Sequence, residues 1–175
     1  MSTTKPLPTI ADVERMAADR HMHGVVNAYI MAKAYAQTWR ERVEPIRRDV
    51  LRLIGATYAD KHGRRTGPIS NPKHAWLMSD EQHREWCAEL DHEYRSRGWL
   101  DKSDDIGVCP ALKAEELERQ AARAVLLAAS EYVDILEPDA LLCAGIEKYR
   151  EGVRIVCGLI VNHSTYRRPK IGGAA

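Results

Sequence analysis

The apolar pattern that decides the fold lies at residues 32–53, AKAYAQTWRERVEPIRRDVLRL. Its apolar side chains are separated alternately by four and three residues: Ala32, Ala36, Trp39, Val43, Ile46, Val50 and Leu53. This spacing is typical of a helix that packs along its length against another helix. Pro45 cannot donate a backbone hydrogen bond, yet the apolar register continues across it. We therefore expect one helix kinked at Pro45, or two helices meeting end to end, finishing near Asp60 with Gly63 as the stop signal.

Capping signals predict helices on both sides of this segment. Thr9 and Asp12 are suited to the start and first turn of an N-terminal helix. Ser79 and Gln82 have the spacing of a capping box, in which Gln82 reaches back to the cap, and the helix that follows is expected to end before Gly98.

The second half of the chain predicts two more helices. Pro110 occupies a favoured first helical position, and the alanine-rich stretch after it is expected to reach about Glu137, where Pro138 ends it. The last helix again shows alternating spacings of four and three residues, at Leu142, Ile146, Tyr149, Val153, Val156 and Ile160.

No stretch of the sequence shows the two-residue alternation of a β-strand. The predicted fold class is therefore all-α, a bundle of four or five helices with coiled-coil-like seams and one long loop at about 61–78. We expect residues 1–162 to form a single helical domain and residues 163–175 to form a flexible basic tail.

Composition narrows the class of protein. The chain has 175 residues, of which 45% are hydrophobic and 29% are charged, which is ordinary for a globular protein. The N-terminus lacks the apolar core of a secretory signal, and the longest apolar stretch, 153–161, is too short to cross a membrane. Four cysteines are too few for a disulfide scaffold of this length. We expect a cytoplasmic protein with free thiols.

Charge is distributed unevenly although the net charge is only +1. Residues 1–75 carry a balance of +6, residues 76–139 of −9 and residues 140–175 of +4. Such segregation allows acidic and basic segments to pair within one chain or between copies, or reflects solvated helix faces.

Possible metal ligands are scattered. Asp19 and His23 are four residues apart on a helix, which favours a surface ion pair over a metal site. A zinc site and a di-iron site are the alternatives, but their ligand spacings are incomplete. The zinc candidates are His74, His83, Cys87 and Cys109, and the di-iron candidates are Glu89 and His92. We predict neither a metal nor another cofactor, and no enzymatic activity; a metal-dependent enzyme is the least favoured alternative.

The densest basic cluster lies between residues 40 and 52. Arg40 and Arg47 share one helix face, and Arg48 and Arg52 share another, so that phosphates could lie along them. Acidic residues interleave with these arginines and are available for ion pairs. Nucleic-acid binding through these four arginines is therefore the alternative function.

Two segments carry a resemblance to a known family. Residues 71–81, NPKHAWLMSDE, followed by residues 109–116, CPALKAEE, resemble small proteins of bacteriophages and prophages. The resemblance spans roughly residues 71–130 and rests on helix caps and core positions. That family carries no established activity, so no functional residue is transferred. The resemblance implies a phage-encoded protein acting in the bacterial cytoplasm or in the virus particle.

The predicted function is binding of a host or phage protein, or of a second copy of the chain, without a membrane. The protein would act as a host-takeover or anti-defence inhibitor, or as a small assembly component. Long loops in compact domains are usually functional or disordered, and carboxylates spaced every four residues line one side of a helix. The candidate contacts are Arg64, Arg65, Pro72 and Trp76 in the loop, and Asp80, Glu81, Glu85, Glu89 and Glu93 on the helix.

Overall fold

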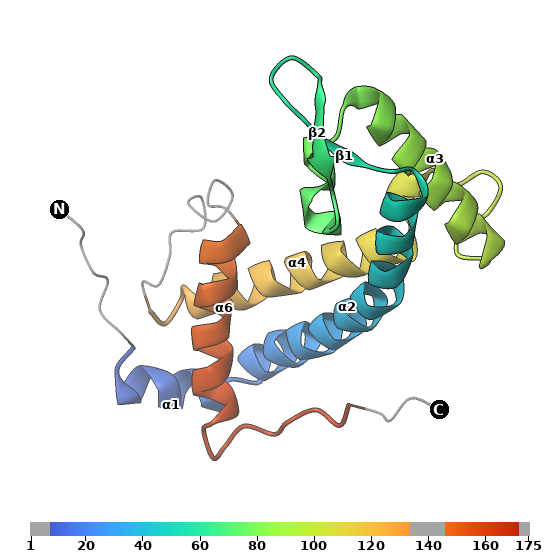
Figure 1. Ribbon diagram of the computed structural model, residues 1–175. Coiled ribbons are helices and arrows are strands. Elements are labelled where there is room, and N and C mark those ends of the chain that lie inside the picture. Colours follow the sequence, from blue (N-terminus) through green and yellow to red (C-terminus); the bar gives the residue numbers. More distant parts are fainter. Residues whose placement is uncertain (1–7, 134–145, 172–175) are drawn as a thin grey trace. The chain divides into compact units, whose positions relative to one another are not determined.

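The computed structural model describes the backbone of residues 8–133 and 146–171, and the side chains of residues 8–133 and 151–171. It is mainly helical with a small two-stranded antiparallel sheet (Figure 1). The elements in chain order are α1 (Ile10–Ala18), α2 (Arg20–Leu53), β1 (Thr57–Ala59), β2 (Arg65–Pro68), η1 (Pro72–Leu77), α3 (Asp80–Ser96), η2 (Ile106–Val108), α4 (Pro110–Ala129) and α6 (Ile146–Val161). The hairpin of β1 and β2 shows that the expectation of a chain without strands was wrong.

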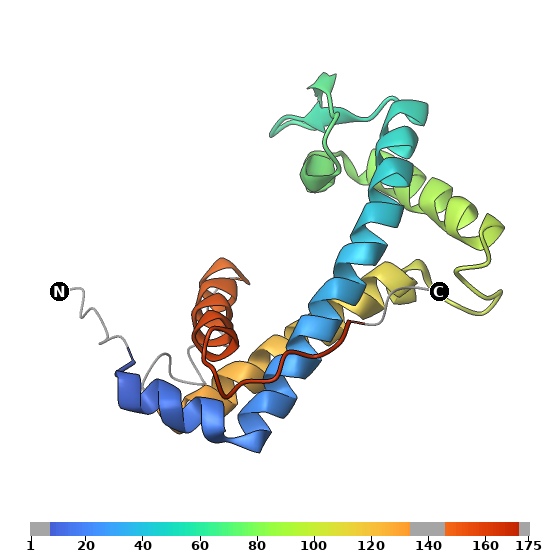
Figure 2. The same ribbon diagram turned by 90° about the horizontal axis from the view of Figure 1, so that it is seen from below.

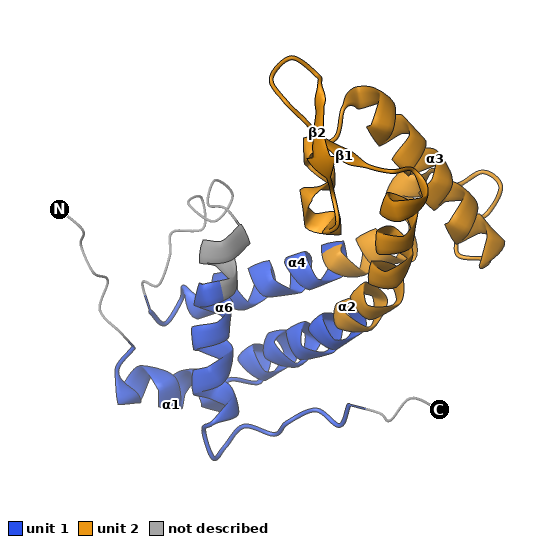
Figure 3. Cartoon of the chain, in the orientation of Figure 1, with its two compact units in different colours: residues 1–35, 116–175 blue, residues 36–115 orange. Residues whose placement is uncertain are grey.

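The chain folds into two compact units (Figure 3). Unit 1 comprises residues 1–35 and 116–175, and unit 2 comprises residues 36–115. The boundaries fall within α2 and α4, so each of these helices contributes residues to both units. Among the described residues, no helix combines the length and the apolar character needed to cross a membrane.

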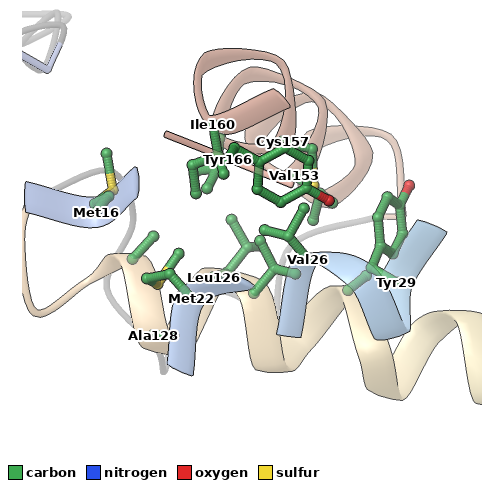
Figure 4. Packing of buried hydrophobic residues seen from close by; sticks show 14 residues of the cluster. Met16, Met22, Val26, Tyr29, Leu126, Ala128, Val153, Cys157, Ile160 and Tyr166 are labelled. Carbon is green, nitrogen blue, oxygen red and sulfur yellow. The ribbon is translucent and has the colours of Figure 1, made fainter. Parts of the chain in front are cut away.

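Unit 1 has its core where α2, α4 and α6 meet (Figure 4). Val26 of α2, Leu126 of α4 and Val153 of α6 are all nearly or fully buried there. Tyr166, in the segment predicted to be a tail, is 7% exposed, and its hydroxyl donates to the Oδ1 atom of Asn27. The stretch around Tyr166 therefore packs on unit 1.

The first cap follows the prediction. Thr9 Oγ1 accepts from the amide of Asp12 at 3.2 Å, and the Asp12 carboxylate accepts from the amide of Thr9 at 2.9 Å. The helix begun in this way ends at Ala18, and α2 starts at Arg20. The predicted ion pair between Asp19 and His23 is not formed: the His23 ring contacts the Ala17 carbonyl, and the Asp19 carboxylate accepts from the Tyr132 hydroxyl.

Helix α2 continues through Pro45 without a break. Of the predicted seam, Ala36, Val43 and Val50 are buried, whereas Leu53 is 69% exposed. The predicted end near Asp60 was wrong because Gly55, with φ 60°, ends α2 at Leu53. The Gly55 amide donates to the Arg52 carbonyl at 3.1 Å, and the Ala56 amide to the Leu51 carbonyl at 3.0 Å, which is a Schellman motif.

The C-terminal half follows the predicted pattern only in part. Helix α3 ends at Ser96, two residues before Gly98, and α4 begins at Pro110, as expected. The predicted end of α4 at about Glu137 was wrong, since α4 ends at Ala129 and the chain turns there. In α6, the seam residues Val153, Val156 and Ile160 are fully buried, as predicted. The stretch from Pro138 to Cys143 and the side chains of Ile146 and Tyr149 lie outside the described residues.

Unit 2 has a separate core beneath α3 and the hairpin. It is built from Val43, Val50 and Leu51 of α2, Ile69 after β2, Ala75 of η1, and Trp86, Leu90 and Tyr94 of α3. Helix α3 ends on a second Schellman motif, in which the Gly98 amide donates to the Arg95 carbonyl at 2.9 Å and the Trp99 amide to the Tyr94 carbonyl at 3.0 Å. The Trp99 and Tyr94 rings then lie 5.6 Å apart. This core fixes which faces of α3 and η1 point outward.

Candidate functional site

The outward side of α3 carries the predicted acidic residues. Gln82, Trp86, Leu90 and Tyr94 recur every four residues and are buried. The positions just before them are Glu81 and Glu85, which are exposed, and Glu89 and Glu93, which are half-buried. Asp80, at the first helical position, is exposed. The carboxylates therefore lie beside the buried stripe, as the spacing predicts.

Internal cations neutralise only one end of this row. Glu93 accepts from Arg97, and Asp91, on a neighbouring stripe, accepts from Arg95 at 2.8 Å. Within the described part of the chain, no ion pair joins a basic side chain to Asp80, Glu81, Glu85 or Glu89. We call these four residues the acidic face of α3. Like charges four residues apart on a helix repel each other, so the pairs Glu81–Glu85 and Glu85–Glu89 weaken α3 when nothing is bound.

The predicted capping box of α3 forms only in part. Ser79 Oγ accepts from the Gln82 amide at 3.3 Å. The Gln82 side chain does not reach back to the cap but is fully buried against Thr57 of β1. When its amide nitrogen faces the Thr57 carbonyl, it donates there at 2.9 Å and its oxygen accepts from the Thr57 amide at 3.2 Å. This contact holds the hairpin on α3.

Asp60 organises the turn of the hairpin. Its carboxylate accepts from the amides of His62 and Arg64, each at 2.8 Å, and from Arg64 Nε at 2.9 Å. The hydrogen bond from the Arg64 amide is the main cause that lowers the pKa of Asp60 below its ordinary value. Gly63 supplies the positive φ of 74° that the turn requires. Arg64 is thus tied to its own turn, whereas Arg65 is exposed without such a partner among the described residues.

Helix η1 presents different residues on its three faces. A 3₁₀ helix has three residues per turn, so residues three apart lie on one face. Pro72, Ala75 and Met78 are all buried, whereas Lys73 and Trp76 are exposed on another face, with Trp76 75% exposed. Pro72, which the sequence predicts as a contact residue, is buried, because the buried face of η1 begins with it.

The hairpin and η1 are in contact. The Tyr58 hydroxyl of β1 lies 3.2 Å from Nδ1 of His74 in η1, and the two rings are 6.2 Å apart. Both views show η1, the short green helix, next to the strands (Figure 2). The exposed side chains of the hairpin and η1 include Lys61, Arg65, Lys73 and Trp76, and we call these four the hairpin–η1 surface.

The arginines of the alternative nucleic-acid site are largely engaged within unit 2. Arg48 pairs with Glu44 at 3.2 Å, and Arg52 pairs with Asp49 at 3.3 Å. Arg40 lies 3.6 Å from Glu115, and the guanidinium of Arg47 lies 5.8 Å from the centre of the Trp86 ring. The structure thus places these arginines where the spacing predicts, but with acidic or aromatic neighbours.

The possible zinc ligands are only partly brought together. His83 Nδ1 lies 3.7 Å from Cys87 Sγ on α3, while Cys109 is buried and only 4% exposed. Burial is the main cause that raises the pKa of Cys87 above its ordinary value, so its thiolate is not favoured. Across the described ranges, no three His, Cys, Asp or Glu side chains are arranged to hold a metal ion.

An open groove of about 470 Å³ lies between α1 and α6 of unit 1. Val13, Ile155 and Leu159 make much of its lining apolar, and Arg154, Asn162 and His163 add polar groups. The sequence offered no signal for this groove, because its two sides lie about 140 residues apart in the chain.

Comparison with known proteins does not add a functional assignment. No protein-family model, curated protein or solved structure matches this chain. The surfaces of unit 2 are therefore the basis for assigning a function.

Proposed function

We propose that this chain is a non-enzymatic, phage-encoded helical-bundle protein that binds another protein in the bacterial cytoplasm. Its partner is a host or phage protein with a basic surface, and its role is that of a host-takeover or anti-defence inhibitor or of a small assembly component. The resemblance of residues 71–130 to phage and prophage proteins supports the phage assignment.

The observation that carries this proposal is the acidic face of α3. Glu81, Glu85 and Glu89 repeat every four residues without a cationic partner in the described chain, although Glu93 on the same row has one. A fold selected only for stability would pair these carboxylates, because each adjacent like-charged pair weakens the helix. A basic partner surface would relieve this repulsion and gain favourable charge complementarity.

Affinity capture from lysate of the bacterial host, with charge-reversed variants, tests the proposal. Glu85→Lys/Glu89→Lys changes the acidic face, and Glu14→Lys/Glu131→Lys makes the same change of charge at exposed carboxylates of unit 1. We expect the wild-type protein and the Glu14→Lys/Glu131→Lys variant to capture a partner in stoichiometric amount. The Glu85→Lys/Glu89→Lys variant should not capture it. An identical set of captured proteins on all three would contradict the proposal.

The alternative through the arginines of α2 is less well supported. Arg48 and Arg52 already have acidic partners three or four residues away, and Arg47 lies over an indole ring. Phosphates would have to compete with these neighbours. A metal-dependent reaction likewise has no favouring observation, because Cys109 is buried away from solvent while His83 is exposed.

A further inference from the structure

We propose that the hairpin–η1 surface binds single-stranded nucleic acid, a second activity separate from the acidic face of α3. Residues 57–78 carry four Lys or Arg residues and one acidic residue, Asp60. Asp60 is occupied by the turn amides and by Arg64. Among the described residues, no acidic side chain pairs with Lys61, Arg65 or Lys73. These three cations are available for phosphates.

Trp76 supplies the second element of the surface. Its indole is 75% exposed, and it shares one face of η1 with Lys73, because the two are one 3₁₀ turn apart. An exposed aromatic ring beside a cation is the arrangement on which an unpaired base stacks while its phosphate is neutralised. A base pair within a duplex has no free face to offer, so the surface fits a single strand.

The surroundings of Trp76 favour a nucleic acid over a protein partner. Protein interfaces place aromatic anchors in a core that is depleted of lysine and of acidic residues. Here Trp76 shares its face of η1 with Lys73, and the hairpin that η1 touches through Tyr58 and His74 carries the exposed cations Lys61 and Arg65. An acidic peptide would satisfy the cations but would leave the indole without a stacking partner.

The binding test uses fluorescence anisotropy with labelled oligo(dT) and oligo(U) of about 12 nucleotides. Three phosphate contacts predict a salt dependence: in a plot of the logarithm of the association constant against the logarithm of the salt concentration, the slope should be about −2. Preference for oligo(U) or oligo(dT) would identify the natural strand as RNA or DNA, and either result supports the proposal. Absence of binding to both at low salt would overturn it.

Charge variants locate the site. Arg65→Gln/Lys73→Gln should weaken binding at least about tenfold. Arg48→Gln/Arg52→Gln removes the same charge from α2 and should leave affinity nearly unchanged, since those arginines are already paired. Equal losses in the two variants would overturn the assignment to the hairpin–η1 surface.

Trp76 variants test stacking. Trp76→Ala should weaken binding about 5- to 150-fold, and Trp76→Phe should retain most of the affinity. Leu53→Ala, at another exposed apolar side chain of unit 2, should have no effect. The proposal would be contradicted if Trp76→Ala bound the oligonucleotide with wild-type affinity, or if the protein bound a duplex as tightly as a single strand. Displacement of the oligonucleotide by polyglutamate at equal charge would also contradict it. The Glu85→Lys/Glu89→Lys variant should still bind the oligonucleotide, which separates this activity from the proposed protein partner.

Discussion

Gln82 illustrates what single residues add to the pattern of the sequence. Its position three residues after Ser79 predicts a role in a capping box, and the hydrogen bond from the Gln82 amide to Ser79 Oγ is formed. Its side chain instead binds Thr57, 25 residues earlier in the chain. A local spacing rule cannot reveal such a contact, because it depends on a hairpin that the sequence pattern does not predict. Trp76, by contrast, is identified from the loop, but its exposure depends on the three-residue period of η1.

Replacing Gln82 should destabilise the protein. In Gln82→Leu, a side chain of similar size stays buried, but the amide and carbonyl of Thr57 lose their partner. Unsatisfied buried polar groups cost about 1–3 kcal/mol, so the free energy of unfolding in urea should fall by about that amount. Gln120→Leu, at an exposed position of α4, is the control and should change it by less than about 0.5 kcal/mol. Equal losses of unfolding free energy in Gln82→Leu and Gln120→Leu would show that the contact between Gln82 and Thr57 does not stabilise the protein.

The thiols should differ in reactivity. Burial raises the pKa of Cys157 to about 12, and only 8% of this residue is exposed. Cys87 is half-buried on α3, so reagent reaches it more easily. After brief iodoacetamide treatment at pH 8, peptide mass spectrometry should find Cys87 alkylated and Cys157 protected until urea unfolds the protein. Faster modification of Cys157 than of Cys87 would contradict the packing of α6.

At the scale of elements, helix starts were predictable and helix ends less so. Thr9, Ser79 and Pro110 mark the starts of α1, α3 and α4 because caps are local. The sequence pattern predicted Gly63 as the stop of α2, whereas Gly55, which also has a positive φ, lies at its end. Gly55 ends it because Ala56 can then be buried while donating to Leu51. The strands escaped prediction because β1 and β2 are only three and four residues long.

Pro45 should weaken α2, in which it is an interior residue. Its nitrogen cannot donate to the Glu41 carbonyl, and its ring crowds the preceding turn. Because Pro45 is exposed, Pro45→Ala should raise the free energy of unfolding by about 1–3 kcal/mol without loss of packing. Lys33→Ala, at another exposed position of α2, should have little effect. A less stable Pro45→Ala protein would mean that unit 2 requires the proline.

The cap of α1 should respond to acid. The hydrogen bond from the Thr9 side chain is the main cause that lowers the pKa of Asp12 to about 2. A carboxylate with a lowered pKa stabilises the fold above its ordinary pKa of 3.8, and this contribution is lost as pH falls through 2. Thr9→Ala should therefore lower the thermal midpoint more at pH 6 than at pH 2. Ser79→Ala is the control, because its partner Gln82 does not titrate, and its effect should not change over that range.

At the scale of the whole molecule, the segregation of charge along the sequence becomes two surfaces on unit 2. The basic excess of residues 1–75 includes the hairpin, and the acidic excess of residues 76–139 includes α3. The sequence could predict that α3 is acidic on one side, since that follows from a four-residue repeat. It could not predict which charges are paired. The arginines of α2 are engaged by neighbours, whereas Lys61, Arg65 and Lys73 have no acidic partner among the described residues.

The most direct test of the central claim measures stability and binding in one variant, Glu85→Gln. This change removes the repulsion of Glu85 with Glu81 and Glu89, so the unfolding free energy at low salt should rise by about 0.5 kcal/mol. In the same preparation, capture of the host partner should weaken or disappear. A protein that becomes less stable, or that captures its partner as well as the wild type does, would show that the acidic face of α3 serves the fold and not a partner.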